Sequence, residues 1–410
     1  MPSPMEDRPG LLLRDSFRYS DAVVIVPPPL VECLACFDGI QTELDLRAAL
    51  VRATGQLQVS ELEAQITTAL SRSGFLEDEN FAALREQAIR AFTEAPVREP
   101  VHAGSAYPSD RPELEETMRH WMNETSGPTG VNVMNGAVPP ARPGLAAIAA
   151  PHVSPEGGYD SYRAAYRLLT PELRDRTFVV LGTSHYGAAE KFGLTRKPYA
   201  TPWGQSRNAT DLVDELTRSA PGAVATEDYC HAVEHSIEFQ VLFLQSIYGP
   251  DIEILPILCG SYATSIYRGG TPESNENVAR FLGSLGEIAT RESKRLFWVL
   301  GIDMAHMGRR YGDPGEMRAN EDMMLAVALR DRLRMDRMAE GDARGFWELV
   351  QENRDDLKWC GSSPIYTFMK VCPNMRGSIE NYEQWNIDQA SVVSFAGMSF
   401  RTQNYRPTSD

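Results

Sequence analysis

The chain has 410 residues and a formal net charge of −16, from 40 basic and 56 acidic side chains. An acidic chain is repelled by nucleic acid and by anionic membranes, so we expect neither as a partner. No apolar stretch is long enough to span a membrane, and the N-terminal sequence MPSPMEDRPG lacks the apolar core of a secretion signal. We therefore expect a cytoplasmic protein, and the length favours two domains.

The six cysteines are sparse and irregularly spaced, as in a reduced cytosolic protein. Cys33 and Cys36 have the CxxC spacing, but no second CxxC completes a four-cysteine zinc site. Their surroundings, PLVECLACFDG, predict a helix on which both thiols lie about one turn apart on an apolar face. We interpret the pair as part of a hydrophobic core, with a redox or metal-binding pair as the alternative.

Residues 1–95 predict a small, mainly helical N-terminal domain. A β-branched run, VVIV, is followed by prolines, and the segments 37–55 and 59–78 carry apolar residues at helical spacing. Short helices followed by GFL are similar to a winged-helix module. Such modules often bind DNA, but this one is acidic, so contact with a protein or peptide is the better functional interpretation. A packing appendage is the alternative, and we favour it.

Residues 100–405 predict an α/β domain. Residues 96–103 resemble a linker, a helix capped by Ser109 or Asp110 follows, and residues 125–143 are rich in Gly, Pro and Asn and predict a loop. From residue 144 onward, apolar runs alternate with amphipathic segments. The runs that predict strands include GLAAIAA, TFVVLG, IEILPILCG, LFWVLG and SVVSFAGMSF. This alternation predicts an α/β fold with a mostly parallel sheet flanked by helices.

Three of these runs end at residues that can bind a metal or carry a proton. GLAAIAAPH ends at His152, TFVVLGTSH at His185, and LFWVLGIDMAH at Asp303 and His306. Open α/β sheets bind ligands beyond the carboxyl ends of their strands, so two imidazoles there can meet at one metal ion. Alone, each histidine is better explained as a hydrogen-bonded loop residue. Asp303 can hold a histidine tautomer or a metal-bound water, with a helix cap or loop acceptor as an equal alternative.

Two further segments add candidates. EHSIEFQ places His235 at the head of a predicted helix, with Glu234 and Glu238 as orienting partners. His231 and His235 have i,i+4 spacing, but HExxH is absent, so we predict that His235 donates or accepts a proton rather than ligating a metal. The alternative is a helix-capping histidine. WCGSSPI supplies Cys360, a metal ligand or nucleophile whose small neighbours allow a close backbone approach, or else an inert buried thiol.

Eight segments resemble, in order, the Memo family, whose bacterial and archaeal members are called AmmeMemoRadiSam system protein B. They lie within residues 100–400 and are AGSAYPSDRPEL, APHVSPEGGY, LGTSHYG, KPYATPWG, HAVEHSIEFQ, LPILCG, GIDMAHMGRRYGD and CGSSPI. The family is related to class III extradiol dioxygenases of the LigB type, so the resemblance implies a LigB-like fold for the α/β domain. Residues 1–95 lie outside this resemblance.

The resemblance also implies a metal site. LigB-type enzymes hold non-haem Fe(II) with two histidines and a glutamate, and Memo proteins have a cysteine in place of the glutamate. The implied metal ligands are His152, His185 and Cys360, and the implied catalytic residues are the acid/base His235 with Asp303 and His306 in the same pocket. Fe(II) is the expected cofactor, and Cu or Zn competes because a thiolate softens the site. Departures from the family pattern, such as VSPEGGY after His152 and Tyr186 after His185, leave the substrate open.

Three functions are compatible with this pattern. The first is a non-haem iron-dependent or copper-dependent oxidoreductase that resembles class III extradiol dioxygenases and acts on a small-molecule or peptide substrate. The second is a non-catalytic metal-binding or peptide-binding scaffold on a dioxygenase-like fold. The third is a zinc hydrolase, ranked last because a second carboxylate ligand is missing. The family name further implies an AMMECR1-like protein and a radical S-adenosylmethionine enzyme as partners.

Overall fold

The computed structural model describes residues 9–123 and 143–403 and divides the chain into two compact units, Met1–Ala95 and Pro96–Asp410. The predicted loop at 125–143 lies outside the described residues, apart from Pro143. Each unit has a hydrophobic core of its own. Among the described residues, no helix combines the length and the apolar character needed to cross a bilayer.

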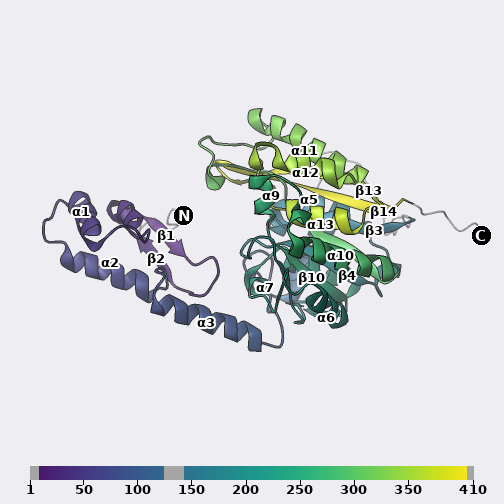
Figure 1. Ribbon diagram of the computed structural model, residues 1–410, viewed down its shortest axis with the longest axis horizontal. Coiled ribbons are helices and arrows are strands. Elements are labelled where there is room, and N and C mark those ends of the chain that lie inside the picture. The colour runs from purple at the N-terminus through teal and green to yellow at the C-terminus, as the bar shows by residue number, and fades with distance from the viewer. Residues whose placement is uncertain (1–8, 124–142, 404–410) are drawn as a thin grey trace, which may run out of the picture. The chain divides into compact units, whose positions relative to one another are not determined.

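The first unit is a β-hairpin followed by helices (Figure 1). Its elements are β1 (Leu11–Arg14), β2 (Val23–Val26), the 3₁₀ helix η1 (Pro28–Cys36), α1 (Glu43–Thr54), α2 (Ser60–Arg72) and α3 (Glu79–Glu94). Strands β1 and β2 are antiparallel. Cys33 lies in the core with Leu46 and Leu50, and Cys36 packs against that core, in agreement with the packing interpretation of the CxxC pair.

A single large sheet organises the second unit. Its main strands, in spatial order, are β12 (His306–Gly308), β14 (Ser391–Thr402), β3 (Leu145–Ala150), β11 (Leu296–Gly301), β4 (Thr177–Thr183), β10 (Glu253–Cys259), β5 (Phe192–Leu194) and β9 (Val224–Thr226). The central strands β3, β11, β4 and β10 are parallel to their neighbours in this group, whereas β14 is antiparallel to β3 and β5 is antiparallel to β10. The predicted α/β class with a mostly parallel central sheet is confirmed.

Two further strands extend this sheet, and two more form a small sheet of their own. Strand β13 (Met375–Asp388) pairs with β14, β8 (Arg207–Asn208) pairs with β10, and β6 (Ala200–Thr201) and β7 (Gly204–Gln205) form a separate pair. The sequence analysis missed β13 because none of its residues is buried and its sequence, MRGSIENYEQWNID, has no apolar run. It nevertheless forms the longest ladder of the described sheet, with the buried strand β14 as its partner.

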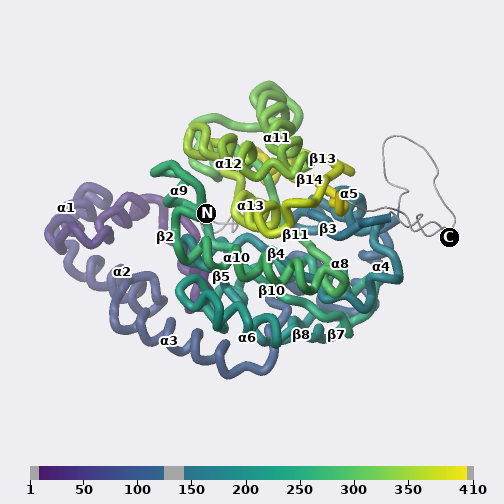
Figure 2. Tube along the Cα trace, turned by 45° about the vertical axis from the view of Figure 1, so that its right-hand side comes forward, coloured from purple at the N-terminus to yellow at the C-terminus, as the bar shows by residue number. Residues whose placement is uncertain are grey.

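Helices cover both faces of the sheet, because successive residues of each buried strand face opposite sides. Ala147 and Ala149 face one core, whereas Ile148 and Ala150 face the other. On the first side lie α6 (Thr210–Ser219), α10 (Glu276–Arg291), α11 (Asp322–Glu340), α12 (Ala343–Gln351) and α13 (Ser362–Val371). On the second lie α4 (Arg111–Met122), α5 (Pro155–Tyr166) and α8 (Glu238–Tyr248). Helices α11 and α12 lie side by side (Figures 1 and 2).

Short helices complete the connections. They are η3 (Pro171–Leu173), α7 (Cys230–Val233), α9 (Ala263–Arg268), η4 (Pro272–Ser274), η5 (Arg309–Tyr311) and η6 (Glu352–Arg354).

Candidate metal centre

Three adjacent parallel strands end at the same edge of the sheet. In their register, Gly301 at the end of β11 lies opposite Ala150 of β3 on one side and Gly182 of β4 on the other. His152 follows two residues after Ala150, Asp303 two residues after Gly301, and His185 three residues after Gly182. The sheet therefore delivers His152, Asp303 and His185 to one place, as the sequence pattern predicts.

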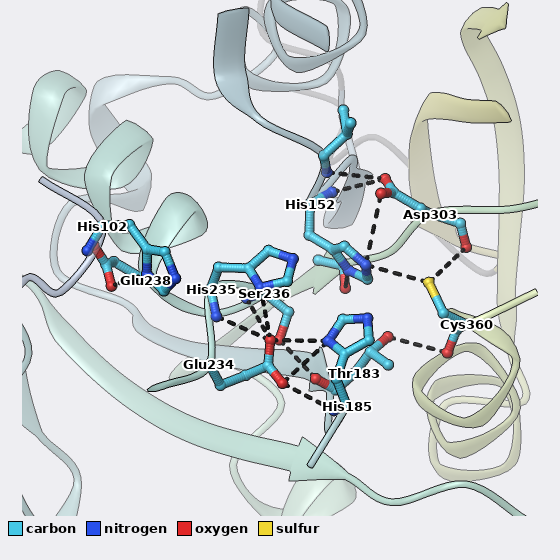
Figure 3. Close-up of polar contacts among 12 residues, drawn as sticks. His102, His152, Thr183, His185, Glu234, His235, Ser236, Glu238, Asp303 and Cys360 are labelled. Atoms are coloured by element: carbon cyan, nitrogen blue, oxygen red, sulfur yellow. Dashed lines mark hydrogen bonds and ion pairs between the residues drawn. The ribbon is translucent and has the colours of Figure 1, made fainter. Parts of the chain in front are cut away.

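Three imidazoles meet beyond this edge (Figure 3). The ring centroids of His152 and His185 are 5.0 Å apart, and those of His152 and His235 are 5.2 Å apart. His185 and His235 are stacked at 5.0 Å. One ring nitrogen from each of the three lies within 4.8 Å of the other two. This spacing allows the three nitrogens to surround a single ion.

Cys360 joins the same cluster from the segment before α13. Its sulfur lies 3.2 Å from Nε2 of His152, a residue 208 positions away in the sequence. The hydroxyl of Thr183, at the end of β4, donates to the carbonyl oxygen of Cys360 at 3.1 Å. The next residue, Gly361, donates its N–H to the carbonyl oxygen of Asp303 at 3.1 Å. The predicted close backbone approach at this glycine is therefore present.

The Nδ1 atoms of the three imidazoles are already held by protein oxygens. His152 Nδ1 lies 2.9 Å from the carbonyl oxygen of Gly301, which can only accept a hydrogen bond. His185 Nδ1 and His235 Nδ1 lie 3.0 Å and 3.2 Å from the same carboxylate oxygen of Glu234. In His152 and His185 these acceptors hold a proton on Nδ1, so Nε2 is the ring atom left to bind a metal ion.

The carboxylate of Glu234 is completely buried and contacts the rings of both His185 and His235. Besides the two rings, its carboxylate accepts the backbone N–H groups of His185 at 2.9 Å, His235 at 2.9 Å and Ser236 at 3.2 Å. Burial raises the pKa of Glu234, but the charge and the hydrogen bonds of His185 outweigh burial and hold that pKa well below its usual range. The sequence analysis assigned Glu234 to His235 alone, whereas the structure shows that it orients both rings.

Charges in the cluster favour a thiolate beside an imidazolium. Burial raises the pKa of Cys360, yet His152 and His185 together hold it below its ordinary value. Burial lowers the pKa of His185, but Glu234 and Cys360 raise it well above the ordinary value. Burial dominates for His235 and holds its pKa well below the ordinary value, so that ring is neutral. The cluster thus holds a thiol whose ionisation is favoured, next to one neutral imidazole.

Asp303 fixes the loop of His152 rather than its tautomer. One carboxylate oxygen accepts the backbone N–H groups of His152 at 2.9 Å and Val153 at 3.2 Å, and the other lies 3.6 Å from Nε2 of His152. Burial raises the pKa of Asp303 to about 6, against the opposing effects of His306 and of the two N–H groups. His306 lies beside it, with Nδ1 2.9 Å from the carbonyl oxygen of Met304 and its ring against Tyr311.

Despite their i,i+4 spacing, His231 and His235 do not lie on one helix. Helix α7 ends at Val233 and α8 begins at Glu238, so His235 lies in the link between two helices. His231 is buried and its Nδ1 lies 2.6 Å from the hydroxyl of Tyr199, away from the cluster.

His102 was missed by the sequence analysis, because it lies in a segment that resembles a linker. Its ring is 5.7 Å from the ring of His235, and its Nδ1 lies 2.9 Å from the carboxylate of Glu238. The sequence predicts Glu238 as a partner of His235, but in the structure Glu238 orients His102 instead (Figure 3). The AGSAYPSDRPEL segment directly after His102 was the only sequence signal that could have marked this residue.

Substitution of Gly361 by alanine is expected to lower the free energy of unfolding by about 1–3 kcal/mol, as overpacking does in cores. An added Cβ would lie 2.7 Å from the carbonyl oxygen of Asp303 and 2.8 Å from Cβ of Ile302. Because both neighbours are held by the sheet, the Cys360 segment must move. Chemical denaturation followed by tryptophan fluorescence measures the change.

The matched control is Gly283→Ala in helix α10, where an added Cβ meets no atom within 4 Å. This variant is expected to be stabilised by about 0.5–1 kcal/mol, because alanine has the higher helix propensity. Equal effects of the two substitutions would contradict the close approach at Gly361.

Comparison with known protein families identifies relatives of this chain. The family model described as "Memo-like protein" matches residues 98–399. A MEMO1 family protein of Aquifex aeolicus is 25% identical over 380 residues, which cover 92% of each chain, so that match extends into residues 1–95. MEMO1 family proteins of Desulfurococcus amylolyticus and Thermococcus kodakarensis are 25% and 28% identical over 314 and 320 residues. Each of these two matches covers 74% of this chain, with 98% and 99% of the relative.

The matched range contains the histidine cluster, its buried carboxylates and Cys360, together with the sheet that carries them. The chain belongs to the Memo-like protein family.

Proposed function

We propose that this protein binds one transition-metal ion through His152, His185 and Cys360 and acts as a metal-dependent redox enzyme on a small-molecule or peptide substrate. The observation that carries the proposal is the convergence of three imidazoles and one thiol, from four separate segments, beyond the carboxyl ends of adjacent parallel strands.

The donor set fits a soft or borderline transition metal. In His152 and in His185, Nδ1 donates to an oxygen and leaves Nε2 for the metal, which is the outer arrangement that metal-bound histidines usually show; the ion would displace the second proton of His185. Cys360 supplies a thiolate, which suits iron, copper or zinc better than magnesium or calcium. These donors leave room for further ligands, as in sites that catalyse reactions.

Fe(II) is the first candidate for the ion, in line with the proposed relation of this sheet to LigB-type dioxygenases. The sulfur of Cys360 softens the site relative to a carboxylate, so copper and zinc compete with iron. When bound, iron or copper supplies redox chemistry and open coordination positions to the site.

The remaining residues have roles that follow from their contacts. His235, held at Nδ1 by Glu234, presents its other nitrogen to the cluster and can take a proton from a substrate hydroxyl and return it. Asp303 holds the backbone of the His152 loop. His306 packs on the ring of Tyr311, and its charge favours the ionised form of Asp303.

Glu234→Gln is expected to weaken metal binding by about 10–100-fold, the usual effect of losing an outer partner of a ligating histidine. An amide keeps the size of the side chain but cannot accept at both oxygens, so the rings of His185 and His235 lose their common anchor. Competition titration with a chromophoric chelator measures the affinity. Glu348→Gln, which makes the same change at an exposed carboxylate paired with Arg344, serves as the control.

Metal analysis of protein purified without added metal, followed by anaerobic loading with Fe(II), tests the function directly. We expect about one equivalent of iron or copper per chain and oxygen uptake with at least one member of a panel of phenols. A protein that takes up neither iron nor copper contradicts the proposal. A protein that holds zinc alone and hydrolyses esters or amides supports the zinc hydrolase instead.

A second candidate function, a metal-binding or peptide-binding scaffold, is favoured by the separate N-terminal unit. That unit has its own core and a groove of about 450 Å³ lined by residues such as Phe37, Leu46 and Thr67. We propose it as a docking module, winged-helix-like in its short helices, for a protein partner such as an AMMECR1-like protein or a radical S-adenosylmethionine enzyme. Complementation by His152→Ala and Cys360→Ala variants supports the scaffold, and failure of both supports catalysis.

A further inference from the structure

A buried carboxylate behind the metal centre has no part in the function described so far. Asp331 lies in the middle of α11 and is completely buried. It accepts three hydrogen bonds: from the indole N–H of Trp359 at 2.8 Å, from the hydroxyl of Tyr382 at 2.7 Å and from the hydroxyl of Ser394 at 2.6 Å. Burying a carboxylate costs free energy that an apolar side chain at this position would not cost. The three hydrogen-bond partners of Asp331 therefore point to a role for the carboxylate.

One of these partners leads directly to the candidate ligand Cys360. Trp359 precedes Cys360 in the chain, and its side chain is buried with its only polar atom on Asp331. A tryptophan held at both its ring and its indole N–H has one orientation. The backbone that carries the sulfur of Cys360 is therefore fixed from α11.

A second partner leads to the loop that follows β11. Ser394 of β14 accepts the N–H of Ala305 with its hydroxyl oxygen at 2.9 Å while the same hydroxyl donates to Asp331. Its backbone also bonds to this loop in both directions, with Met304 at 2.8 Å and with Ala305 at 2.9 Å. This loop begins at Asp303, which holds the backbone of His152.

The two segments that Asp331 holds also contact each other. Gly361 donates to the carbonyl oxygen of Asp303 at 3.1 Å, and His306 donates its N–H to the carbonyl oxygen of Leu357 at 2.9 Å. The sulfur of Cys360 lies 3.7 Å from that same oxygen of Asp303. The position of the sulfur relative to the His152 loop thus depends on the contacts between these two segments. Asp331 holds both segments, through Trp359 on one side and Ser394 on the other.

We propose that Asp331 is a positioning residue of the metal centre, which sets the distance between the Cys360 sulfur and the imidazole of His152 without touching either. The inference rests on the proposed metal site. The carboxylate of Asp331 suits this task because both of its oxygens accept hydrogen bonds. An asparagine that accepted from Trp359 would turn its N–H₂ group toward the hydroxyls of Tyr382 and Ser394, which donate to Asp331 in the wild-type protein.

Cobalt(II) titration of the metal-free protein tests the inference, because a thiolate bound to Co(II) gives a charge-transfer band in the near ultraviolet. In the wild-type protein we expect this band, and Cys360→Ser should remove it. In Asp331→Asn we expect a weaker or shifted band and about a tenfold lower Co(II) affinity, within the range for outer partners of metal ligands. Trp359→Phe, which removes one of the three donors and keeps the ring, should move the band in the same direction.

Tyr248→Phe is the matched control, since it removes another buried hydrogen bond, 2.8 Å long, to the carbonyl oxygen of Thr170. It should lower thermal stability without changing the band. A wild-type protein without a band that depends on Cys360 refutes the proposed metal site and this inference with it. A normal wild-type band that persists unchanged in folded Asp331→Asn and Trp359→Phe refutes the positioning role alone. If Asp331→Asn does not fold, Trp359→Phe decides.

Discussion

His152→Ala is expected to abolish metal binding at micromolar ion concentrations, a larger loss than the 10–100-fold that outer partners of ligands contribute. His152 is the imidazole closest to the sulfur of Cys360, and its ring faces both His185 and His235. Its removal therefore takes away one ligand and the neighbour that stabilises the thiolate. Isothermal titration with Fe(II) under anaerobic conditions, or with Zn(II), measures the loss.

The control for this substitution is His120→Ala. His120 is exposed on α4 and packs only against the ring of Tyr159 among its aromatic neighbours in the described chain. Its replacement removes a histidine without changing the cluster, so metal affinity should stay at the wild-type value. If His152→Ala keeps the wild-type affinity as well, the ion binds elsewhere and the proposed ligand set is wrong.

Arg98→Met is expected to destabilise the second unit by about 3–5 kcal/mol, the usual effect of breaking a buried ion pair from one side. The side chains of Arg98 and Glu238 form this pair and neither is accessible to solvent. Arg98 also donates to the carbonyl oxygens of His231 at 2.8 Å and Glu234 at 2.7 Å. Without the guanidinium, the buried carboxylate loses its permanently charged partner and keeps only His102 and Tyr107 beside it.

Tryptophan fluorescence in urea measures this effect selectively, because all six tryptophans lie in the unit Pro96–Asp410. Arg344→Ala is the control, since Arg344 forms an ion pair with Glu348 whose side chains are 87% and 61% exposed. Exposed pairs contribute little, so this variant should unfold close to the wild-type midpoint. Similar midpoints for Arg98→Met and Arg344→Ala would show that the buried pair does not stabilise the unit.

The same pair predicts a dependence of stability on acid. Burial raises the pKa of Glu238, but Arg98, His102 and Tyr107 outweigh it and lower the pKa from 4.5 to about 2. A carboxyl group whose folded pKa is lowered stabilises the protein above its unfolded pKa, and this contribution is lost as the pH falls through the folded value. The wild-type protein should therefore lose stability between about pH 4.5 and pH 2, more steeply than Glu238→Gln. Parallel pH profiles of the two proteins would contradict this assignment.

The sequence predicts the part of the site that depends on strand ends. Apolar runs that stop at His152, His185 and Asp303 can be recognised because buried parallel strands are almost wholly apolar and their carboxyl ends share an edge. The family was also recognised from sequence, and the matching family model confirms it. The mostly parallel sheet flanked by helices follows from the same alternation of runs.

Contacts made across the fold could not be predicted in this way. The hydrogen bonds from His102 to Glu238, and from Trp359 and Ser394 to Asp331, join segments whose separation in sequence carries no periodic signal. Strand β13 escaped detection because its half-buried residues are mostly polar, so neither an apolar run nor a strict alternation marks it. In each case the partner, rather than the local sequence, determines the role of the residue.

The spacing of residues in the sequence also does not decide whether His235 or Cys360 is the third metal ligand. The ring nitrogens of His152, His185 and His235 lie within 4.8 Å of one another, and the sulfur of Cys360 lies 3.2 Å from Nε2 of His152. Sequence order and ring geometry alone do not separate these two candidates. A metal–sulfur bond does separate them, because sulfur lies farther from the ion than nitrogen and backscatters the photoelectron more strongly.

X-ray absorption at the metal edge of the zinc-loaded protein therefore tests the central claim most directly. The proposed site predicts one sulfur scatterer at about 2.3 Å together with imidazole nitrogens at about 2.0–2.1 Å, and loss of the sulfur contribution in Cys360→Ser. A spectrum of the wild-type protein that is fitted by nitrogen and oxygen alone, and that does not change in Cys360→Ser, would contradict it.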